Sequence, residues 1–205
     1  MRLFRPGFLT RILYPGAVFR VKTNGKVLYL TFDDGPDPAT TPVIETILEK
    51  YNIRALFFCS GEAAEKHHGL IKLLISKGHL IGNHGYNHLS GWDTSTEEYL
   101  RDTEKAAEFT SGFLFRPPYG RITPLQFAKL RHRYKIVFWD LMPYDFDMGF
   151  GKKESLRVLD RLIRPGSVIV LHDRQGSSSV SIAEEFIISA QARGFRFGDP
   201  EDMRS

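Results

Sequence analysis

The chain has 205 residues, the length of one ordinary domain, and its hydrophobic content of 42% and charged content of 25% exclude a disordered protein. The formal net charge is +4, but the cationic residues are scattered, so no nucleic-acid partner is expected. The single cysteine, Cys59, excludes an intrachain disulfide bond, and no apolar stretch approaches the ~20 residues of a membrane-spanning helix.

Residues 1–15 are apolar and basic, but Arg5, Pro6 and Arg11 interrupt the continuous apolar stretch that a secretory signal requires. Two hypotheses remain for this segment: it packs across the wall of the domain, or it makes a weak contact with a membrane surface as a short amphipathic anchor. We therefore divide the chain into a packing or peripheral segment, residues 1–25, and a main domain, residues 26–205. Without a cleavable signal peptide or a transmembrane helix, the expected location is cytoplasmic or membrane-peripheral.

Short apolar, β-rich runs alternate with helical patterns through the main domain. The runs predict seven strands, at residues 27–32, 55–58, 80–82, 113–115, 136–139, 168–171 and 195–197. Helices are predicted between them, at residues 42–51, 69–77, 95–110, 123–133, 154–162 and 180–192. In the first helix Pro42 suits the first turn, and Thr41 is the candidate N-cap. Strands that alternate with helices form a parallel sheet, and this pattern fits a barrel and a doubly wound sheet equally well.

Polar residues directly follow five of the predicted strands. The carboxyl ends of parallel strands share one edge, so these residues are expected to converge on one site. The segments are 31–36 (TFDDGP), 83–88 (NHGYNH), 116–120 (RPPYG), 139–140 (WD) and 171–173 (LHD).

Asp34, His84 and His88 are candidate metal ligands. Taken separately, the acidic pair at 33–34 also suits a solvated turn, and two histidines four residues apart are a weak signal. Together the three side chains supply two imidazoles and one carboxylate, which is the ligand set of a catalytic zinc site with an open position for water. A divalent ion in such a site lowers the pKa of bound water towards ~7.

Three further residues are candidates for proton transfer. Asp33 is the spare carboxylate and is placed to accept a proton from the attacking water. Arg116 is expected to pair with Asp33 and keep it ionised, although a surface ion pair is the simpler alternative. His172 ends an apolar strand, so it is either a buried histidine bonded to a backbone carbonyl or a general acid.

These residues resemble the polysaccharide deacetylases of carbohydrate esterase family 4, the NodB-homology domain. The resemblance covers about residues 26–197 and depends on four motifs in order, at 31–36, 84–88, 116–120 and 171–173. It implies an α/β fold, a distorted (β/α) barrel with about seven parallel strands. It also implies a metal-dependent hydrolase that removes acetyl groups from the N-acetylated sugars of a polysaccharide or oligosaccharide. The divalent metal is expected to be Zn²⁺, with Co²⁺, Ni²⁺ or Mn²⁺ as alternatives.

The resemblance also implies a role for each site residue. Asp34, His84 and His88 would bind the metal. The catalytic residues would be the base Asp33, its orienting partner Arg116, the acid His172, and Tyr119 through its backbone N–H at the oxyanion. Tyr119, Leu171 and Trp139 would contact the substrate, with Leu171 lining the pocket for the acetyl methyl group.

The sequence departs from the family pattern at two positions. Gly85 stands where the family usually has Ser or Thr, and its missing hydroxyl is expected to cost loop rigidity. Met142 stands where an aspartate usually partners the acid histidine, which leaves Asp140 and Asp145 as candidate partners for His172. These departures motivate one alternative, a carbohydrate-binding domain of the same fold with weak or lost catalysis. The resemblance implies a second alternative, a deacetylase that acts on O-acetyl esters, because some members of the family use the same chemistry on esters. The sequence makes no prediction of oligomeric state.

Overall fold

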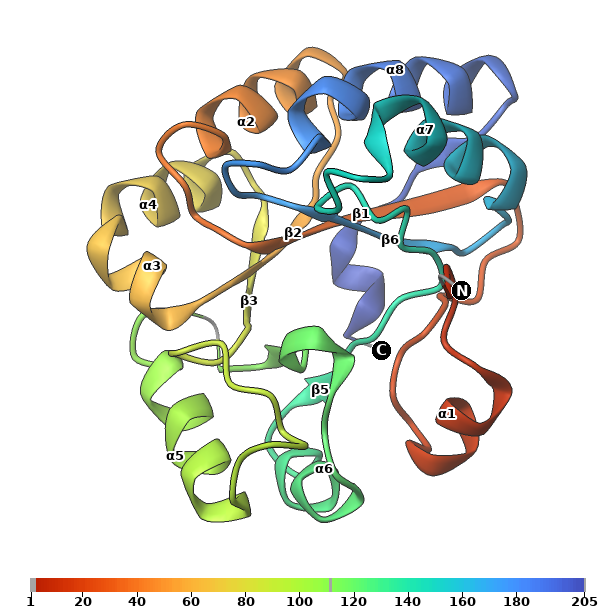
Figure 1. Ribbon diagram of the computed structural model, residues 1–205. Coiled ribbons are helices and arrows are strands. Elements are labelled where there is room, and N and C mark those ends of the chain that lie inside the picture. Colours follow the sequence, from red (N-terminus) through yellow and green to blue (C-terminus); the bar gives the residue numbers. More distant parts are fainter. Residues whose placement is uncertain (1–2, 111, 205) are drawn as a thin grey trace.

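Seven parallel strands form the centre of the molecule in a computed structural model that describes residues 3–110 and 112–204 (Figure 1). The strands are β1 (Val27–Asp34), β2 (Leu56–Cys59), β3 (Leu80–Asn83), β4 (Leu114–Phe115), β5 (Lys135–Ile136), β6 (Val168–His172) and β7 (Arg196–Phe197). Each of the seven coincides with a strand predicted from the apolar runs, and most are shifted by one or two residues at their ends.

The strands form one curled sheet in the order β5-β4-β3-β2-β1-β6, and β7 pairs with the start of β1. Every pairing between these strands is parallel. An isolated bridge between Leu141 and Ile169 links the segment after β5 back to β6. The sheet therefore curls into an incomplete barrel, and the expected distorted (β/α) barrel of about seven strands is confirmed.

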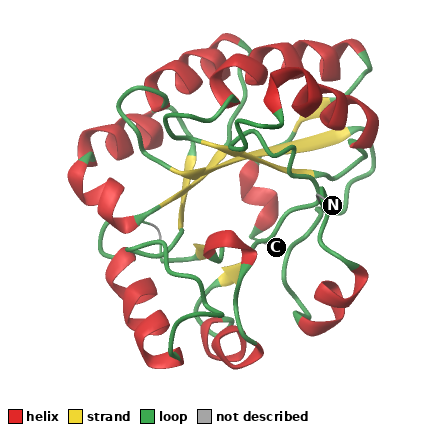
Figure 2. Cartoon of the chain, viewed as in Figure 1, coloured by secondary structure: helices red, strands yellow, loops and turns green. Residues whose placement is uncertain are grey.

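Helices surround the curled sheet, as Figure 2 shows by colour. The helices are α1 (Phe8–Leu13), α2 (Thr41–Lys50), α3 (Gly61–Lys66), α4 (His68–Ser76), α5 (Thr96–Ala106), α6 (Pro124–Leu130), α7 (Gly151–Leu162) and α8 (Ser179–Ala192), with short 3₁₀ turns η1 (Pro118–Gly120) and η2 (Pro200–Met203). Of the eight α-helices in the described part of the chain, the sequence patterns predict six and miss α1 and α3. None of the helices described is long and apolar enough to cross a lipid bilayer.

The proposed cap of α2 is wrong. Thr40, not Thr41, is the N-cap residue, and its side chain makes no capping hydrogen bond. The hydroxyls of Thr40 and Thr41 donate instead to the buried carboxylate of Asp173, over 2.6 and 2.5 Å. A carboxylate without access to water needs donors more than an exposed helix end does, so the hydroxyls turn away from the helix.

Successive side chains of the central strands point alternately to an outer apolar core and to the interior of the barrel. Register pairs Phe32 with Leu171 and Asp33 with His172. Phe32 and Leu171 belong to a large apolar cluster that also includes buried residues of α2 and α8. Because successive strand residues face opposite sides, Asp33 and His172 share the inner face, and this face carries the polar site.

The N-terminal segment is attached to the barrel at several points. Val18 bridges to Val137 and Arg20 bridges to Ser167. Tyr14 is buried in an aromatic cluster beside α6, and the Phe4 ring packs against Tyr144 at 5.6 Å between ring centroids. The described part of the segment thus contacts the barrel on both sides of α1, whereas α1 itself has no buried residue.

Candidate active site

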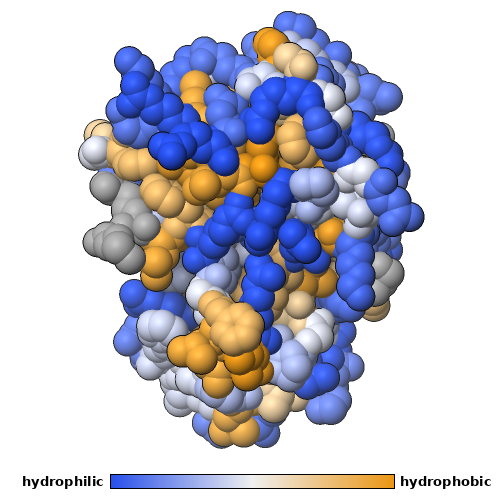
Figure 3. All heavy atoms as spheres, turned by 90° about the vertical axis from the view of Figure 1, so that its right-hand side faces the viewer, coloured by the Kyte–Doolittle hydropathy of each residue, from blue (hydrophilic) through white to orange (hydrophobic). Residues whose placement is uncertain are grey.

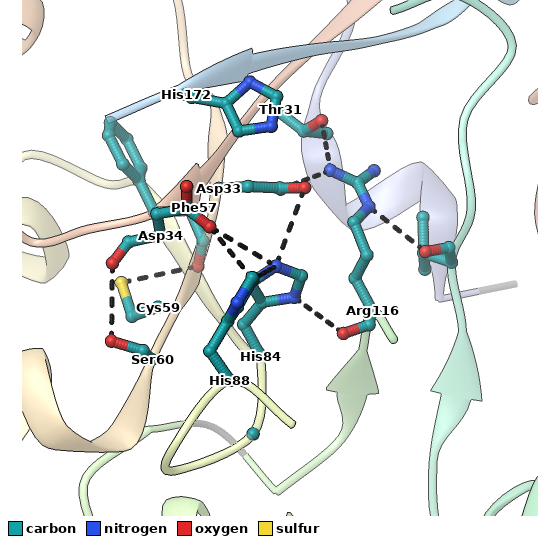
Figure 4. Close-up of polar contacts among 12 residues, drawn as sticks. Thr31, Asp33, Asp34, Phe57, Cys59, Ser60, His84, His88, Arg116 and His172 are labelled. Carbon is teal, nitrogen blue, oxygen red and sulfur yellow. Dashed lines mark hydrogen bonds and ion pairs between the residues drawn. The ribbon is translucent and has the colours of Figure 1, made fainter. Parts of the chain in front are cut away.

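The carboxyl ends of β1, β3, β4 and β6 bring the predicted polar residues to one end of the barrel (Figure 4). Asp33 and Asp34 end β1, His84 follows β3, Arg116 follows β4, and His172 ends β6. In the view of Figure 4, the two carboxylates lie between His172 and the paired imidazoles of His84 and His88. Four segments that are far apart in the sequence thus build one site.

The ligand atoms of Asp34, His84 and His88 lie within 4.8 Å of one another. The Oδ1 atom of Asp34 is 3.2 Å from Nε2 of His88 and 3.7 Å from Nε2 of His84, and the two Nε2 atoms are 3.2 Å apart. Four ligands at ~2.1 Å around a tetrahedral zinc ion are separated by roughly 3.4 Å. The three atoms therefore have the spacing that one tetrahedral ion requires, and the residues present fit a zinc site.

The surroundings of His84 and Asp34 favour metal binding. The Nδ1 of His84 lies 2.7 Å from the backbone oxygen of Arg116, a contact that fixes the ring and directs Nε2 at the other ligands. Burial lowers the pKa of His84 to about 4, so the imidazole is neutral and its lone pair is free. Burial alone would raise the pKa of Asp34, but its hydrogen bond to His88 and the charge of His172 outweigh burial and lower the pKa.

Strained backbone accompanies these residues. Asp34 and His88 adopt φ angles of 77° and 55°, and Tyr119 and Tyr144 beside them adopt 57° and 59°. Left-handed conformations are costly for residues other than glycine, and proteins retain them mainly where surrounding structure enforces a functional geometry. The strained backbone thus lies in the segments that carry two candidate ligands and two neighbouring tyrosines.

Asp102 of α5 fixes the loop that carries the two histidines. Its buried carboxylate accepts hydrogen bonds from the backbone N–H groups of Tyr86 and Asn87, over 2.8 and 3.0 Å, and from the Asn87 side chain over 2.7 Å. Gly85 has a φ of 72°, and a Cβ atom there would lie 2.9 Å from the Asp102 carboxylate. The loop that lacks the family's hydroxyl is therefore held by a carboxylate from a neighbouring helix, a residue that the motif analysis missed.

Asp33 is held by Arg116 at the centre of the site. The Arg116 Nη1 donates to Asp33 Oδ1 over 2.6 Å and to the hydroxyl of Thr31 over 2.7 Å. The guanidinium is fully buried, stacks 4.2 Å from the Phe58 ring centroid, and donates to two backbone carbonyls. The alternative of a surface ion pair is excluded, because both side chains lie inside the barrel. The other oxygen, Oδ2 of Asp33, is 3.9 Å from Nε2 of His84 and faces the candidate metal position.

The partner of His172 is Asp145. Oδ1 of Asp145 lies 2.9 Å from Nδ1 of His172, and Oδ2 accepts the His172 backbone N–H over 2.7 Å. Burial opposes protonation of His172, but the charge and hydrogen bond of Asp145 raise its pKa above the usual value. The alternative of a histidine bonded only to a backbone carbonyl is thereby excluded.

Asp140 is not the partner of His172. Its carboxylate is buried against Arg164, Ser167, Arg5 and Arg11. Asp140 lies in the segment that follows β5, where this segment packs against the arginines of the N-terminal segment. Of the two candidate partners from the sequence, the structure therefore places Asp145, and not Asp140, against His172.

A pocket of about 590 Å³ opens over these groups. Tyr119, Trp139, Met142, Tyr144, Phe146 and Arg174 line it together with the polar residues described above. Trp139 packs so closely on Gly120 that a Cβ atom there would lie 2.4 Å from the indole. Arg174, which the sequence analysis did not identify, places Nε 3.2 Å from the second oxygen of Asp34. The pocket thus has aromatic walls above a charged floor, which suits a sugar ring that carries a polar reactive group.

Leu171 does not line this pocket. It is fully buried in the outer core and is absent from the pocket wall. Because His172 points inward, strand alternation directs Leu171 to the opposite face, beside Phe32. The expected contact between Leu171 and an acetyl group is therefore wrong. Tyr119, by contrast, does line the pocket, and its backbone N–H donates to no acceptor among the residues that the structure describes.

Comparison with known proteins agrees with this geometry. A family model described as polysaccharide deacetylase matches residues 20–133. A peptidoglycan-N-acetylglucosamine deacetylase of Bacillus cereus is 30% identical over 188 residues, which cover 87% of this chain and 88% of the relative. A chitooligosaccharide deacetylase of Azorhizobium caulinodans is 31% identical over 201 residues, 88% of this chain and 95% of the relative. The crystal structure of the Bc1960 peptidoglycan N-acetylglucosamine deacetylase superimposes with a TM-score of 0.85 at 30% identity and covers 97% of this chain and 96% of that one.

Proposed function

Because the chain belongs to the polysaccharide deacetylase family, we propose that it is a metal-dependent hydrolase that removes acetyl groups from the N-acetylated sugars of a polysaccharide or oligosaccharide. One observation carries the proposal. The ligand atoms of Asp34, His84 and His88 have the separations of a tetrahedral ion, and the spare carboxylate Asp33 lies beside them. The similar proteins named above act on peptidoglycan or chitooligosaccharides, which supports a glycan substrate.

Asp34, His84 and His88 would hold the ion, for which we propose Zn²⁺. A bound Zn²⁺ would supply Lewis acidity, polarising the acetamide carbonyl and lowering the pKa of water in the site towards ~7. Asp33 accepts the proton of the water whose oxygen attacks the carbonyl carbon. Arg116 pairs with Asp33 and fixes the orientation of its carboxylate, because the guanidinium is itself held by four other contacts.

His172 completes the reaction from the other side of the site. With its pKa raised by Asp145, the imidazolium donates a proton to the sugar nitrogen as the carbon–nitrogen bond breaks. The products are acetate and a free amine. Tyr119 lines the pocket, and its backbone N–H has no acceptor among residues 3–110 and 112–204, so we propose that it donates to the oxygen that gains negative charge. We propose that residues 26–205 form this catalytic domain, with residues 1–25 as a segment attached to its wall.

The contacts of His172 favour catalysis over the alternative of a carbohydrate-binding domain with weak or lost catalysis. That alternative arose from Met142, at the position of the usual acid partner, and Asp145 supplies the partner instead. The missing hydroxyl at Gly85 also gives this alternative little support, because Asp102 holds the loop that carries His84 and His88. The catalytic function is therefore the one that the contacts support.

Acetate release tests the proposal. The purified chain, supplied with Zn²⁺, is incubated with an N-acetylated chitooligosaccharide and with peptidoglycan fragments. We expect acetate and free amine in equal amounts, loss of activity on chelation, and recovery when Zn²⁺ is restored. An O-acetylated xylooligosaccharide run in parallel separates amide from ester hydrolysis. Absence of acetate from every N-acetylated substrate, with the metal bound, would contradict the proposal.

A further inference from the structure

Helix α1 (Phe8–Leu13) has its amphipathic faces reversed. Phe8, Leu9, Ile12 and Leu13 lie on one face by helical spacing, and they are 78%, 71%, 58% and 55% exposed. The polar face turns toward the domain instead, where the Arg11 guanidinium reaches the buried carboxylate of Asp140. A helix of a soluble domain normally buries its apolar stripe, so α1 presents to solvent the side that elsewhere packs inward.

Positive charge surrounds this apolar face. Between residues 3 and 32 the sequence contains five cationic residues and no acidic residue. Arg5, Arg11 and Arg164 all contact one carboxylate, that of Asp140, and Arg20 lies near enough to Arg5 to act on its charge. One carboxylate neutralises only one of these guanidiniums, so the base of α1 carries a net positive charge. Figure 3 looks at this side of the molecule and shows apolar atoms that protrude beside a band of strongly hydrophilic ones.

The segment that carries α1 is fixed at both ends. The Met142 backbone N–H donates to the Phe4 carbonyl over 3.0 Å, and the Tyr144 hydroxyl bonds to the backbone of Leu3 over 3.1 Å. After the helix, Tyr14 is buried and its hydroxyl donates to the carbonyl of Ile122. The apolar face is therefore displayed on a fixed support and is not the end of a loose tail.

We propose that α1 docks on the surface of an anionic lipid bilayer, with its four apolar side chains in the headgroup layer and the surrounding arginines against lipid phosphates. A protruding apolar helix ringed by cations matches this partner, because a bilayer offers both an apolar interior and a negative surface. A protein partner would need a concave apolar site with acidic edges. Met142 and Tyr144 also line the pocket, so the docked helix would hold the pocket close to the membrane.

Co-sedimentation with vesicles tests the docking. The full chain is mixed with vesicles of phosphatidylglycerol and phosphatidylcholine in equal parts, and with vesicles of phosphatidylcholine alone. We expect the chain to bind the anionic vesicles at least about tenfold more tightly and to be released by added salt. The combined variant Phe8→Ser, Leu9→Ser, Ile12→Ser and Leu13→Ser should bind them at least about tenfold more weakly. Arg20→Gln should weaken binding about fivefold and leave folding unchanged.

A matched control removes exposed apolar side chains from other faces of the molecule. The control variant carries Val43→Ser, Ile75→Ser, Leu125→Ser and Ile188→Ser, at side chains 43%, 57%, 58% and 50% exposed. It should bind vesicles like the original chain. Equal binding by the α1 variant and the original chain would overturn the proposal. So would failure of the original chain to bind, or a dimer in solution that the α1 variant dissociates. The assay needs neither metal nor turnover, so its outcome is independent of the deacetylase proposal.

Discussion

Replacing Asp145 by asparagine tests the role of the residue that the family pattern does not supply. The Asp145 side chain is fully buried, and its contact with Nδ1 of His172 spans 2.9 Å. A hydrogen bond between ionised groups contributes about 1.5–3 kcal/mol. At ~1.36 kcal/mol per tenfold change in rate, loss of this bond should lower kcat by about 10- to 150-fold.

The pH dependence of kcat carries a second signature. Asp145 raises the pKa of His172, so the protonated acid persists to higher pH than an ordinary histidine would allow. In the Asp145→Asn variant the opposing effect of burial is no longer balanced, and the pKa of His172 falls. The alkaline limb of the profile of kcat against pH should therefore move to lower pH, as measured by acetate release across a series of buffers.

Asp140→Asn is the matched control, because it makes the same change at a buried aspartate that contacts arginines instead of His172. It should lower stability but leave the alkaline limb where it is, when rates are expressed per folded molecule. A shifted limb in Asp140→Asn, or an unchanged profile in Asp145→Asn, would refute the assignment.

Three other substitutions test separate parts of the site. Asp33→Asn should lower kcat by about 10²- to 10⁴-fold while zinc content, measured by mass spectrometry, stays at the original level; full activity would rule Asp33 out as the base. Asp102→Asn should weaken Zn²⁺ affinity by about 10- to 100-fold in a chelator competition, and unchanged affinity would show that the loop does not depend on Asp102. Leu171→Ala should cost about 2–5 kcal/mol in urea unfolding without changing KM, whereas a raised KM in folded protein would restore Leu171 to the pocket.

Much of this architecture is predictable from the sequence, because the carboxyl ends of parallel strands lie at the same edge of the sheet. The apolar runs at residues 27–32 and 168–171 are buried on both faces, and the polar residues that directly follow them must meet at one edge of the sheet. Strand alternation also contains the information that corrects Leu171, since Leu171 and His172 are adjacent and must face opposite sides. That error came from following the motif without the geometry of the strand.

Other features depend on contacts between segments whose relative positions in space cannot be predicted from the sequence. The choice between Asp140 and Asp145 depends on the backbone path of an irregular loop. Such a loop has no repeating pattern of apolar residues from which its path could be predicted. One feature of the sequence could have identified Asp102. It lies on the same face of α5 as the buried residues Tyr99 and Ala106, where a charged side chain needs a partner. The reversed faces of α1 show only in three dimensions, because amphipathic spacing does not reveal which face turns outward.

The central claim is that Asp34, His84 and His88 together hold one divalent cation. A crystal of the zinc-loaded protein, measured on both sides of the zinc absorption edge, locates the ion by its anomalous scattering. We predict one peak about 2.0–2.2 Å from Oδ1 of Asp34 and from Nε2 of each histidine, with Asp33 outside bonding distance. No peak at that position, or an ion bound elsewhere, would contradict the account, because the attacking water would then have no activating metal.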